Sequence, residues 1–438
     1  MKKYLLVLAA AIAIATGSWY AYAAHSRNMP LLPSQAPAAA TANLASAQDL
    51  PRLQVQNLVQ YIPPDSATSR TFSWQVEPGM TGPWSLEYRP TGTKPVASVS
   101  AQTTTVPAYK DNELPQTMYA AYVTELRPAT TYEYRLTNQV KATAWQQFTT
   151  TTAGLNHYKV LVFGDAQSAN YNVWGQTAVN AFQKNPDASF FIGMGDNVDN
   201  GQDLWQWRAW FENARPLLAK LPWAPVLGNH EAYSLDWKVA KPETFPAIVA
   251  VPENGPANQK RLAYSFNYGD VHFVALNTTW QETRKWYPDL ITEEAEWLRH
   301  DLAAAREAHQ RIIVLMHRNL WEYPFNGPYD PHGKAFGPLF DQYNVELVFT
   351  AHVHSYSRTQ PYKNGHAAAS GAVHISTGRS GEKTWPGSIR KTWDAAFYNP
   401  VDSPMYVVLE VEPQDFKVTA YKQDGTEIDT ATIPTKKY

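Results

Sequence analysis

Five apolar stretches of this sequence each end in polar residues of the types that bind metal ions. In chain order, these ends read Gly164-Asp165-Ala166-Gln167, Gly195-Asp196-Asn197-Val198-Asp199, Gly228-Asn229-His230-Glu231, Met316-His317-Arg318-Asn319 and Ala351-His352-Val353-His354. Carboxylate and amide oxygens together with imidazole nitrogens, with no thiolate among them, suit divalent ions such as Mn, Fe or Zn. The residue types alone therefore predict a metal site.

Taken singly, each of these ends has an ordinary structural explanation. An aspartate after a glycine commonly belongs to a turn or a helix cap, and a lone histidine is commonly a hydrogen-bonded structural residue. The His352-x-His354 pair is more specific, because residues two apart on a strand project from the same face. Together the five ends favour a metal site, since open α/β sheets gather functional residues beyond the carboxyl ends of their strands.

The elements that would position these residues form an α/β layered domain, which we place at residues 154–438. Short apolar strands alternate there with helical patterns. The helical pattern TEEAEWLRHDLAAAREA has Thr292 as its predicted N-cap, with Glu293 and Glu294 in the first turn. A β-meander with a hairpin turn at Asp424-Gly425 is predicted near the end of the sequence.

An all-β domain is predicted before it, at residues 52–153. Short runs such as RTFSWQV, WSLEYRP and YEYRLTN alternate apolar and polar residues with period two. The order Leu126-x-Pro128 followed by Tyr132-x-Tyr134 resembles a tyrosine corner, in which a tyrosine hydroxyl bonds to nearby backbone. These features predict a fibronectin-like or immunoglobulin-like β-sandwich.

The first 51 residues carry a predicted export signal and a spacer. Met1-Lys2-Lys3 precedes an apolar run, and Ala21-Tyr22-Ala23 fits a cleavage site, so we expect a signal peptide at residues 1–23. The protein would then be exported: periplasmic, secreted or at the cell surface. An uncleaved segment that tethers the chain to a membrane is the alternative, because weak apolar character continues to Ala24. Residues 24–51 are rich in Ala and Pro, which predicts a disordered linker.

Composition narrows the function further. The chain has 438 residues, 44% of them hydrophobic, which is enough for about two to three domains with their own cores. Its net charge of -2 gives no support for nucleic acid as a binding partner. It contains no cysteine, so disulfides, thiolate metal sites and a cysteine nucleophile are excluded.

The ordered series GD, GDNVDN, GNHE, a lone histidine and HVHSYSR resembles the calcineurin-like metallophosphoesterases. The preceding sandwich makes the chain similar to the purple acid phosphatase branch. The resemblance implies a four-layer α/β/β/α domain around two metal ions, and it covers residues 53 to 435. It implies that Asp165 and His354 hold one ion, that Asn229, His317 and His352 hold the other, and that Asp196 bridges both.

The resemblance also implies the chemistry. A metal-bound hydroxide would attack phosphorus, and His230 would act as the general acid or donate a hydrogen bond to the phosphate. Purple acid phosphatases carry a tyrosine three residues after the bridging aspartate, and its Fe(III) complex gives their colour; here that residue is Asp199. We expect Asp199 to orient His230, with direct metal ligation as the alternative.

Two further positions depart from the family pattern. Gln167 stands where many members have a histidine ligand, so its amide oxygen is a candidate ligand, and a position outside the ligand shell is equally open. Ala351 replaces the usual glycine before the His-x-His pair.

Two arginines are candidate substrate-binding residues. Arg318 directly follows His317, and Arg379 lies in the loop STGRSGEK. A structural role is the alternative for each of them. His272 and His374, which lie within apolar strands, are interpreted as structural.

The function predicted from the sequence is hydrolysis of small phosphate monoesters by an exported enzyme with two metal ions. Two alternatives stay open. The same site could act on phosphodiesters or nucleotides, because the sequence does not define contacts to the leaving group. The chain could also be an inactive surface binding protein whose sandwich domain carries the function.

Overall fold

The computed structural model describes residues 55–77, 80, 82–320 and 331–436. The predicted signal peptide and the whole of the predicted linker lie outside them, so both stay predictions. In the part of the chain that is described, no helix combines the length and the apolar character that crossing a membrane requires.

The N-terminal region is a β-sandwich, as predicted. One of its sheets has the order β4-β3-β7-β8, with bounds Ala97–Ser100, Ser85–Pro90, Thr131–Thr137 and Gln146–Thr149. The strands that face it are β1 (Val55–Tyr61), β2 (Arg70–Val76), β6 (Gln116–Val123) and β5 (Gln102–Val106). Alternate residues of both sheets, such as Trp74 on β2 and Leu136 on β7, fill one apolar core between them.

Tyr132 makes the backbone contact expected of a tyrosine corner. Its hydroxyl oxygen accepts a hydrogen bond from the backbone N–H of Arg127 at 2.9 Å. The contact ties the start of β7 to the preceding turn, as the sequence pattern predicted.

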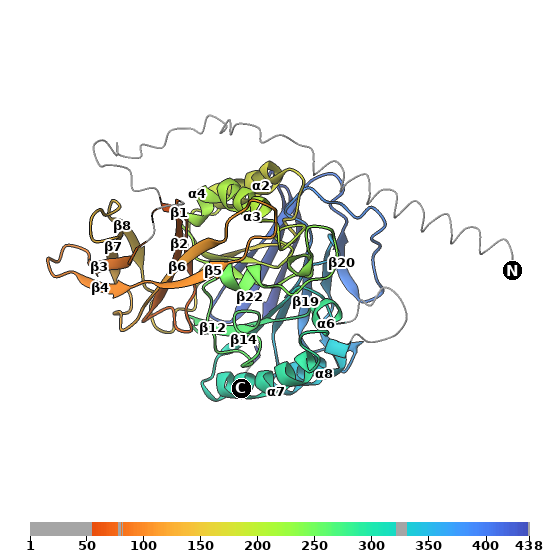
Figure 1. The fold of residues 1–438 in the computed structure, drawn as a ribbon. Helices are drawn as coiled ribbons and strands as arrows, with labels where there is room; N and C mark the ends of the chain where they lie inside the picture. The colour runs from red at the N-terminus through yellow and green to blue at the C-terminus, as the bar shows by residue number, and fades with distance from the viewer. Residues whose placement is uncertain (1–54, 78–79, 81, 321–330, 437–438) are drawn as a thin grey trace. The chain divides into compact units, whose positions relative to one another are not determined.

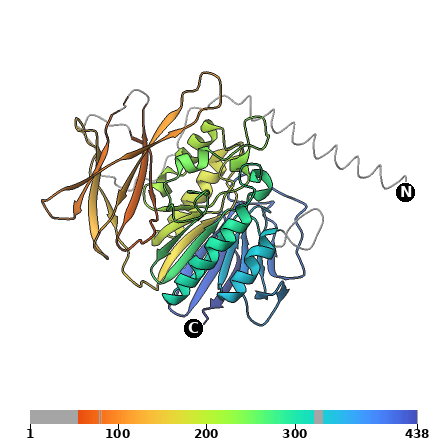
Figure 2. The ribbon, with the colours of Figure 1, turned by 60° about the horizontal axis from the view of Figure 1, so that its bottom comes forward.

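The sandwich and the α/β domain share a sheet. Strand β1 pairs in parallel with β11 (Trp223–Pro225), with Tyr61 opposite Trp223. The resulting ten-stranded sheet has the order β23-β22-β21-β9-β10-β11-β1-β2-β6-β5 (Figures 1 and 2). Its other strands in the α/β domain are β9 (Tyr158–Phe163), β10 (Ala188–Gly193), β21 (Met405–Val411), β22 (Asp415–Lys422) and β23 (Glu427–Pro434).

A second, seven-stranded sheet packs against it. Its order is β12-β13-β14-β15-β19-β16-β20, with bounds Tyr264–Tyr268, Val271–Leu276, Arg311–Met316, Leu347–Thr350, Val373–Thr377, Tyr356–Thr359 and Asp394–Tyr398. The side chains of β13 alternate in where they pack. Phe273 and Ala275 join the core between the two sheets, whereas Val274 and Leu276 join the core beneath the helices. The same alternation in β14 makes this sheet an inner layer of the predicted four-layer domain.

Helices cover the outer faces of both sheets. On the first sheet lie α2 (Tyr171–Lys184), α3 (Leu204–Asn213) and α4 (Arg215–Leu218), and on the second lie α7 (Leu290–Glu307) and α8 (Pro331–Gln342) (Figure 2). The smaller elements are η1 (His230–Ala232), α5 (Thr244–Ile248), α6 (Trp280–Thr283), β17 (Tyr362–Lys363) and β18 (His366–Ala367).

The predicted start of α7 was wrong. The helix begins at Leu290, two residues before Thr292, and Asp289 occupies the N-cap position. Leu290 is fully buried, so burial of this side chain outweighs the capping preference of Thr292. The hairpin predicted at Asp424-Gly425 is confirmed between β22 and β23, where Gly425 has a φ of +92°.

Candidate metal centre

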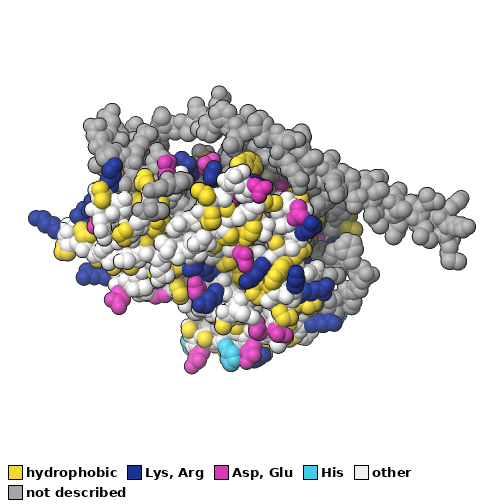
Figure 3. Space-filling view, in the orientation of Figure 1, with side chains coloured by type: hydrophobic (Ala, Val, Ile, Leu, Met, Phe, Trp, Pro, Cys, Tyr) yellow, Lys and Arg dark blue, Asp and Glu magenta, His cyan; other side chains and the backbone are white. Residues whose placement is uncertain are grey.

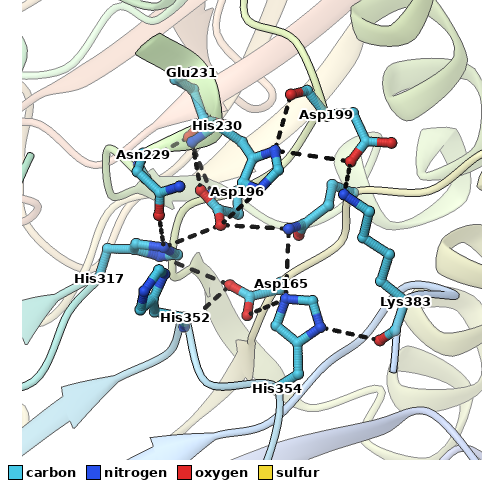
Figure 4. A network of polar contacts seen from close by, with 12 residues as sticks. Asp165, Asp196, Asp199, Asn229, His230, Glu231, His317, His352, His354 and Lys383 are labelled. Atoms are coloured by element: carbon cyan, nitrogen blue, oxygen red, sulfur yellow. Dashed lines mark hydrogen bonds and ion pairs between the residues drawn. The ribbon is translucent and has the colours of Figure 1, made fainter. Parts of the chain in front are cut away.

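All five polar strand ends meet at one place between the two sheets (Figure 4). Asp165, Asp196 and Asn229 follow β9, β10 and β11 of the first sheet. His317 and the His352-x-His354 pair follow β14 and β15 of the second. The strands end at the same edge of each sheet because they run parallel, so residues far apart in sequence come together.

The side chains lie within direct contact of one another. His317 Nε2 is 3.1 Å from Asp196 Oδ2 and 3.1 Å from Asn229 Oδ1. His354 Nε2 is 3.2 Å from Asp165 Oδ2. Asp196, His317 and His352 each offer a ligand atom, and these atoms lie within 4.8 Å of one another. The cluster has the donor types and the compactness of a metal site.

Backbone carbonyls fix the orientation of two of the histidines. His317 Nδ1 lies 2.8 Å from the carbonyl oxygen of Met194, and His354 Nδ1 lies 3.1 Å from that of Lys383. A carbonyl only accepts hydrogen bonds, so each Nδ1 carries a proton. The Nε2 atoms, which face the carboxylates, are the ring atoms left to bind a cation.

Close backbone contact explains the glycines before Asp196 and Asn229. A Cβ atom on Gly228 would lie 2.1 Å from the backbone nitrogen of Asp196, and one on Gly195 would lie 2.7 Å from the backbone nitrogen of Gly228. The two loops can touch only because both residues are glycine. Asp196 itself has a φ of +51°, a conformation that L-residues adopt at a cost and that is common at functional sites.

Glu231 holds the two loops in this arrangement, a role that the sequence analysis did not assign. Its carboxylate accepts hydrogen bonds from the backbone N–H groups of Asp196, Asn197 and Gly228 at 3.0, 2.7 and 2.8 Å. Burial and the nearby Asp196 carboxylate raise the pKa of Glu231 to about 7. Its place directly after His230 in GNHE was the available sequence signal.

His230 lies beside the cluster and not within it. Its Nδ1 is 2.8 Å from the backbone carbonyl oxygen of Asp199, and its Nε2 is 3.9 Å from Asp196 Oδ2. The carbonyl requires a proton on Nδ1, so Nε2 carries a proton only when the ring is an imidazolium. Burial lowers the pKa of His230 and Lys383 adds to this effect, while Asp196 opposes it.

Asp199 contacts His230 mainly through its backbone. Its carboxylate is 3.8 Å from His230 Nδ1 and forms an ion pair with Lys383. The backbone N–H of Asp199 donates to Gln206 Oε1 at 2.7 Å. The residue thus lies where it was expected to orient His230, but the close contact is made by its carbonyl.

Gln167 reaches the cluster. Its Nε2 lies 3.3 Å from Asp196 Oδ2 and 3.5 Å from His354 Nε2. In the described part of the chain, its buried Oε1 has no hydrogen-bond partner. The buried Asp165 Oδ2 accepts no hydrogen bond there either, because the His354 Nε2 beside it at 3.2 Å carries no proton. Buried oxygens of this kind are costly unless something binds them, so the residues present fit a cation.

Electrostatics within the cluster are dominated by the carboxylates. Burial would lower the pKa of His317, but Asp196 and Asp165 outweigh it and raise that pKa to about 9. Burial and the Asp196 charge raise the pKa of the Asp165 carboxyl well above its ordinary value. A cation would displace the His317 proton, because a ligating imidazole is neutral.

The two candidate arginines are held by protein groups. Arg318 donates to Glu282 Oε1 at 2.6 Å. Arg379 donates to the backbone carbonyls of Pro400 and Gly381 at 2.8 and 2.6 Å, and its backbone lies beside that of Asp165 in an isolated bridge. These contacts give both arginines structural roles, and substrate contact stays a prediction.

The two histidines interpreted as structural lie away from the cluster. His272 is held between Asn267 and Asp301, with 2.7 Å to each. His374 lies on β19 and is buried, which lowers its pKa to about 3.

Comparison with protein families agrees with this geometry. Residues 158–356 match the calcineurin-like phosphoesterase family, and residues 56–150 match the purple acid phosphatase N-terminal domain. The observed architecture, a β-sandwich followed by an α/β domain, agrees with both matches. The chain thus combines a calcineurin-like phosphoesterase domain with a region that matches the purple acid phosphatase N-terminal domain.

Individual relatives support the same family. Purple acid phosphatase 18 of Arabidopsis thaliana is 31% identical over 41% of this chain and 40% of its own length. For purple acid phosphatase 23 of the same plant, the match is 28% identical and spans 56% of this chain and 52% of the relative. The matched region thus spans about half the length of these relatives or less. Acid phosphatase type 7 of Mus musculus is 26% identical over 70% of this chain and 75% of its own length.

Solved structures share the fold. Purple acid phosphatase PPD1 from yellow lupin (Lupinus luteus) seeds has a TM-score of 0.72 at 20% identity, covering 87% of this chain and 74% of that one. The structure of PhoD has a TM-score of 0.60 at 14% identity and covers 89% of this chain and 94% of that one. At these identities the likeness concerns the fold.

Proposed function

We propose that this protein is an exported phosphomonoesterase that depends on two metal ions. The observation that carries the proposal is the convergence of Asp165, Asp196, Asn229, His317, His352 and His354 from five strand ends of both sheets. Contacts among the side chains of the first four of these residues and His354 run from 3.1 to 3.7 Å, and a His352 ligand atom lies within 4.8 Å of those of Asp196 and His317. The family match over residues 158–356 supports phosphate esters as the substrate class.

The ligands divide into two groups in this proposal. Asp165, His354 and Gln167 hold one ion, and Asn229, His317 and His352 hold the other. Asp196 lies between the groups, and its Oδ2 is close to both Gln167 and His317. Mn, Fe and Zn all suit this donor set. Such ions supply an activated water and positive charge against the phosphoryl oxygens.

His230 provides the proton for the leaving group. Its Nδ1 is occupied by the Asp199 carbonyl, so it donates from Nε2, the atom that faces Asp196. Only the imidazolium form has this proton, and the lowered pKa of His230 therefore favours activity at acid pH. Removing one positioned acid typically costs about 10²- to 10⁴-fold in rate.

Export is proposed from the first 23 residues, whose basic start, apolar run and Ala-x-Ala pattern fit a cleaved signal peptide. Determining the N-terminal residue of protein from the extracytoplasmic fraction tests this. A mature start near residue 24 supports cleavage, and an intact Met1 in a membrane fraction supports a tether instead.

The enzymatic proposal is tested by metal analysis and turnover together. The purified protein is reconstituted with Mn, Zn or Fe and assayed with 4-nitrophenyl phosphate and bis(4-nitrophenyl) phosphate. Two ions per chain and faster hydrolysis of the monoester are expected. No hydrolysis with any metal, or no affinity for metal, overturns the proposal. Faster hydrolysis of the diester would assign phosphodiesters, and not monoesters, as the substrate class.

A further inference from the structure

Trp385 lies against the histidines of the candidate metal centre. Its ring stacks on His354, with 5.1 Å between ring centroids and 20° between the planes, and it meets His352 edge-on at 5.8 Å. His354 is almost fully buried, whereas Trp385 is 45% exposed. One part of the indole thus covers a proposed ligand while another part faces solvent.

The loop that carries Trp385 is fixed in place. The side-chain nitrogen of Asn399 donates to the backbone carbonyls of Trp385 and Pro386 at 3.0 and 3.3 Å. Ser388 Oγ donates to the carbonyl of Val353, between the two histidines, at 3.2 Å. An exposed aromatic ring that is held by backbone contacts loses little freedom when a ligand stacks on it.

Further aromatic rings stand beside His230. Trp237 and Tyr233 meet the His230 ring edge-on at 6.0 and 5.2 Å. Lys383 joins the two groups, because its Nζ lies 5.3 Å from the Trp237 ring and its carbonyl contacts His354. The proposed general acid and the proposed ligands therefore both carry aromatic neighbours.

We propose that Trp385 is a specificity-determining residue that stacks on a planar aromatic group attached to the phosphate. This inference rests on the proposed function and names its substrate class: phosphate esters with an aromatic ring near the phosphoryl group, such as aryl phosphates or nucleotides. The ring packs on the exposed indole while the phosphate lies over the histidines beside it. Stacking of this kind is worth roughly a tenfold change in affinity.

The test measures binding, so that it does not depend on turnover. Calorimetric titration of the manganese-loaded full chain compares phenylphosphonate, methylphosphonate and the methylenephosphonate analogue of adenosine 5′-monophosphate, a nucleotide ligand without an ester bond to hydrolyse. The wild type is expected to prefer each aromatic ligand over methylphosphonate by about tenfold, and Trp385→Ala is expected to bring that ratio close to one. Trp385→Phe should keep about a third of the preference, because a smaller ring still stacks.

Trp145→Ala is the matched control. This tryptophan lies in the sandwich region, where Arg89 and Arg135 pack over its ring, so its loss should not alter the ratio. A ratio that is the same in wild type and Trp385→Ala overturns the inference, as does an equal loss of affinity for all three ligands, which indicates a purely structural role on His354. Failure to bind any of them also overturns it.

The titrations with the two aromatic ligands distinguish aryl phosphates from nucleotides as the substrate class. A preference for phenylphosphonate alone assigns aryl phosphates, and a preference for the nucleotide alone assigns nucleotides. Ester hydrolysis without a Trp385-dependent ratio rejects this inference and leaves the proposed function standing. A Trp385-dependent ratio without hydrolysis does the reverse.

Discussion

Asp196 and Asp199 are three residues apart, but their carboxylates have different kinds of neighbours. We call the surroundings of Asp196 the first corner of the site and those of Asp199 the second corner. In the first corner, the carboxylate of Asp196 faces His317 and His230, and Glu231 holds the surrounding backbone. In the second, the carboxylate of Asp199 is neutralised by the ammonium group of Lys383. Among the described residues, the salt-bridge partners of Asp196 are histidines alone.

This difference separates two tasks of a carboxylate. A carboxylate that is paired with a lysine has its charge compensated within the protein. A carboxylate whose only ion-pair partners are imidazoles can bind a cation without first losing a permanently charged partner. The contrast agrees with the proposal that Asp196 binds the metal ions and that Asp199 contacts the neighbouring protein.

The largest effect is expected for Asp196→Asn. The amide keeps the shape but removes the charge between the two ligand groups, so kcat/KM for 4-nitrophenyl phosphate should fall roughly 10³-fold. Elemental analysis should show fewer than two ions per chain. Asp270→Asn, which breaks a contact with Arg311 at 2.6 Å, is the control that should retain both. If Asp196→Asn still held two ions tightly, the proposed difference in role between Asp196 and Asp199 would be wrong.

Removing the metal should make the free energy of unfolding depend on pH through His317, which lies in the first corner. Without a cation, His317 has a pKa of about 9 in the folded protein, above its ordinary 6.5. Its stabilising contribution is then complete below pH 6.5 and lost as the pH rises through 9, a loss of about 3 kcal/mol.

Denaturant unfolding of chelator-treated protein between pH 6.5 and 9.5 measures this loss. In the metal-loaded protein the loss should be absent over the same range, because the cation replaces the proton. A flat profile in the metal-free protein would mean that Asp196 does not hold a proton on His317.

A smaller effect is expected for Glu231→Gln, which acts on the first corner through the backbone. One accepting oxygen becomes an amide group that faces N–H donors, so metal affinity should fall by about 10- to 100-fold. Competition with a chelator measures it. Glu346→Gln is the matched control, because Glu346 is also buried and accepts a backbone N–H from Ile312 at 2.8 Å, away from the cluster. Equal loss in both variants would point to general destabilisation.

The smallest effect is expected for Asp199→Asn, in the second corner. Both ions should stay bound, and kcat should fall by about tenfold, since the Asp199 carbonyl still holds His230 while the Lys383 pairing is weakened. Kinetics and elemental analysis on one preparation test this. Asp402→Asn, which weakens a surface contact with Lys422 at 2.6 Å, should not change kcat. Loss of an ion from Asp199→Asn would make the two aspartates alike.

The sequence predicted the members of the cluster better than the groups that hold them. Asp165, Asn229 and His317 were recognisable because each directly follows an apolar strand. The contacts of Glu231 and Lys383 were not, since Lys383 meets Asp199 across 184 residues and no local pattern encodes that pairing. The same limit applies to Asp199, whose side chain was expected to orient His230 although its carbonyl makes the contact.

Fold prediction shows a similar division. The sandwich, the α/β domain and the Asp424-Gly425 hairpin follow from alternation and turn residues, which are local properties. The start of α7 was misplaced because burial of Leu290 depends on the tertiary structure. The pairing of β1 with β11 could not be predicted, because each segment has the pattern of an ordinary strand and neither pattern indicates which strand it pairs with.

That pairing makes the two parts of the chain hard to separate by truncation. A fragment that begins at residue 154 would lack β1, so β11 would become an edge strand of its sheet. Trp223, which lies on β11 and is fully buried in the whole protein, would then lie at that edge. Unpaired strand edges with apolar side chains attract other chains, so the shortened protein would tend to aggregate. Strand β1 thus pairs with an edge of the α/β sheet that would otherwise be open to other chains.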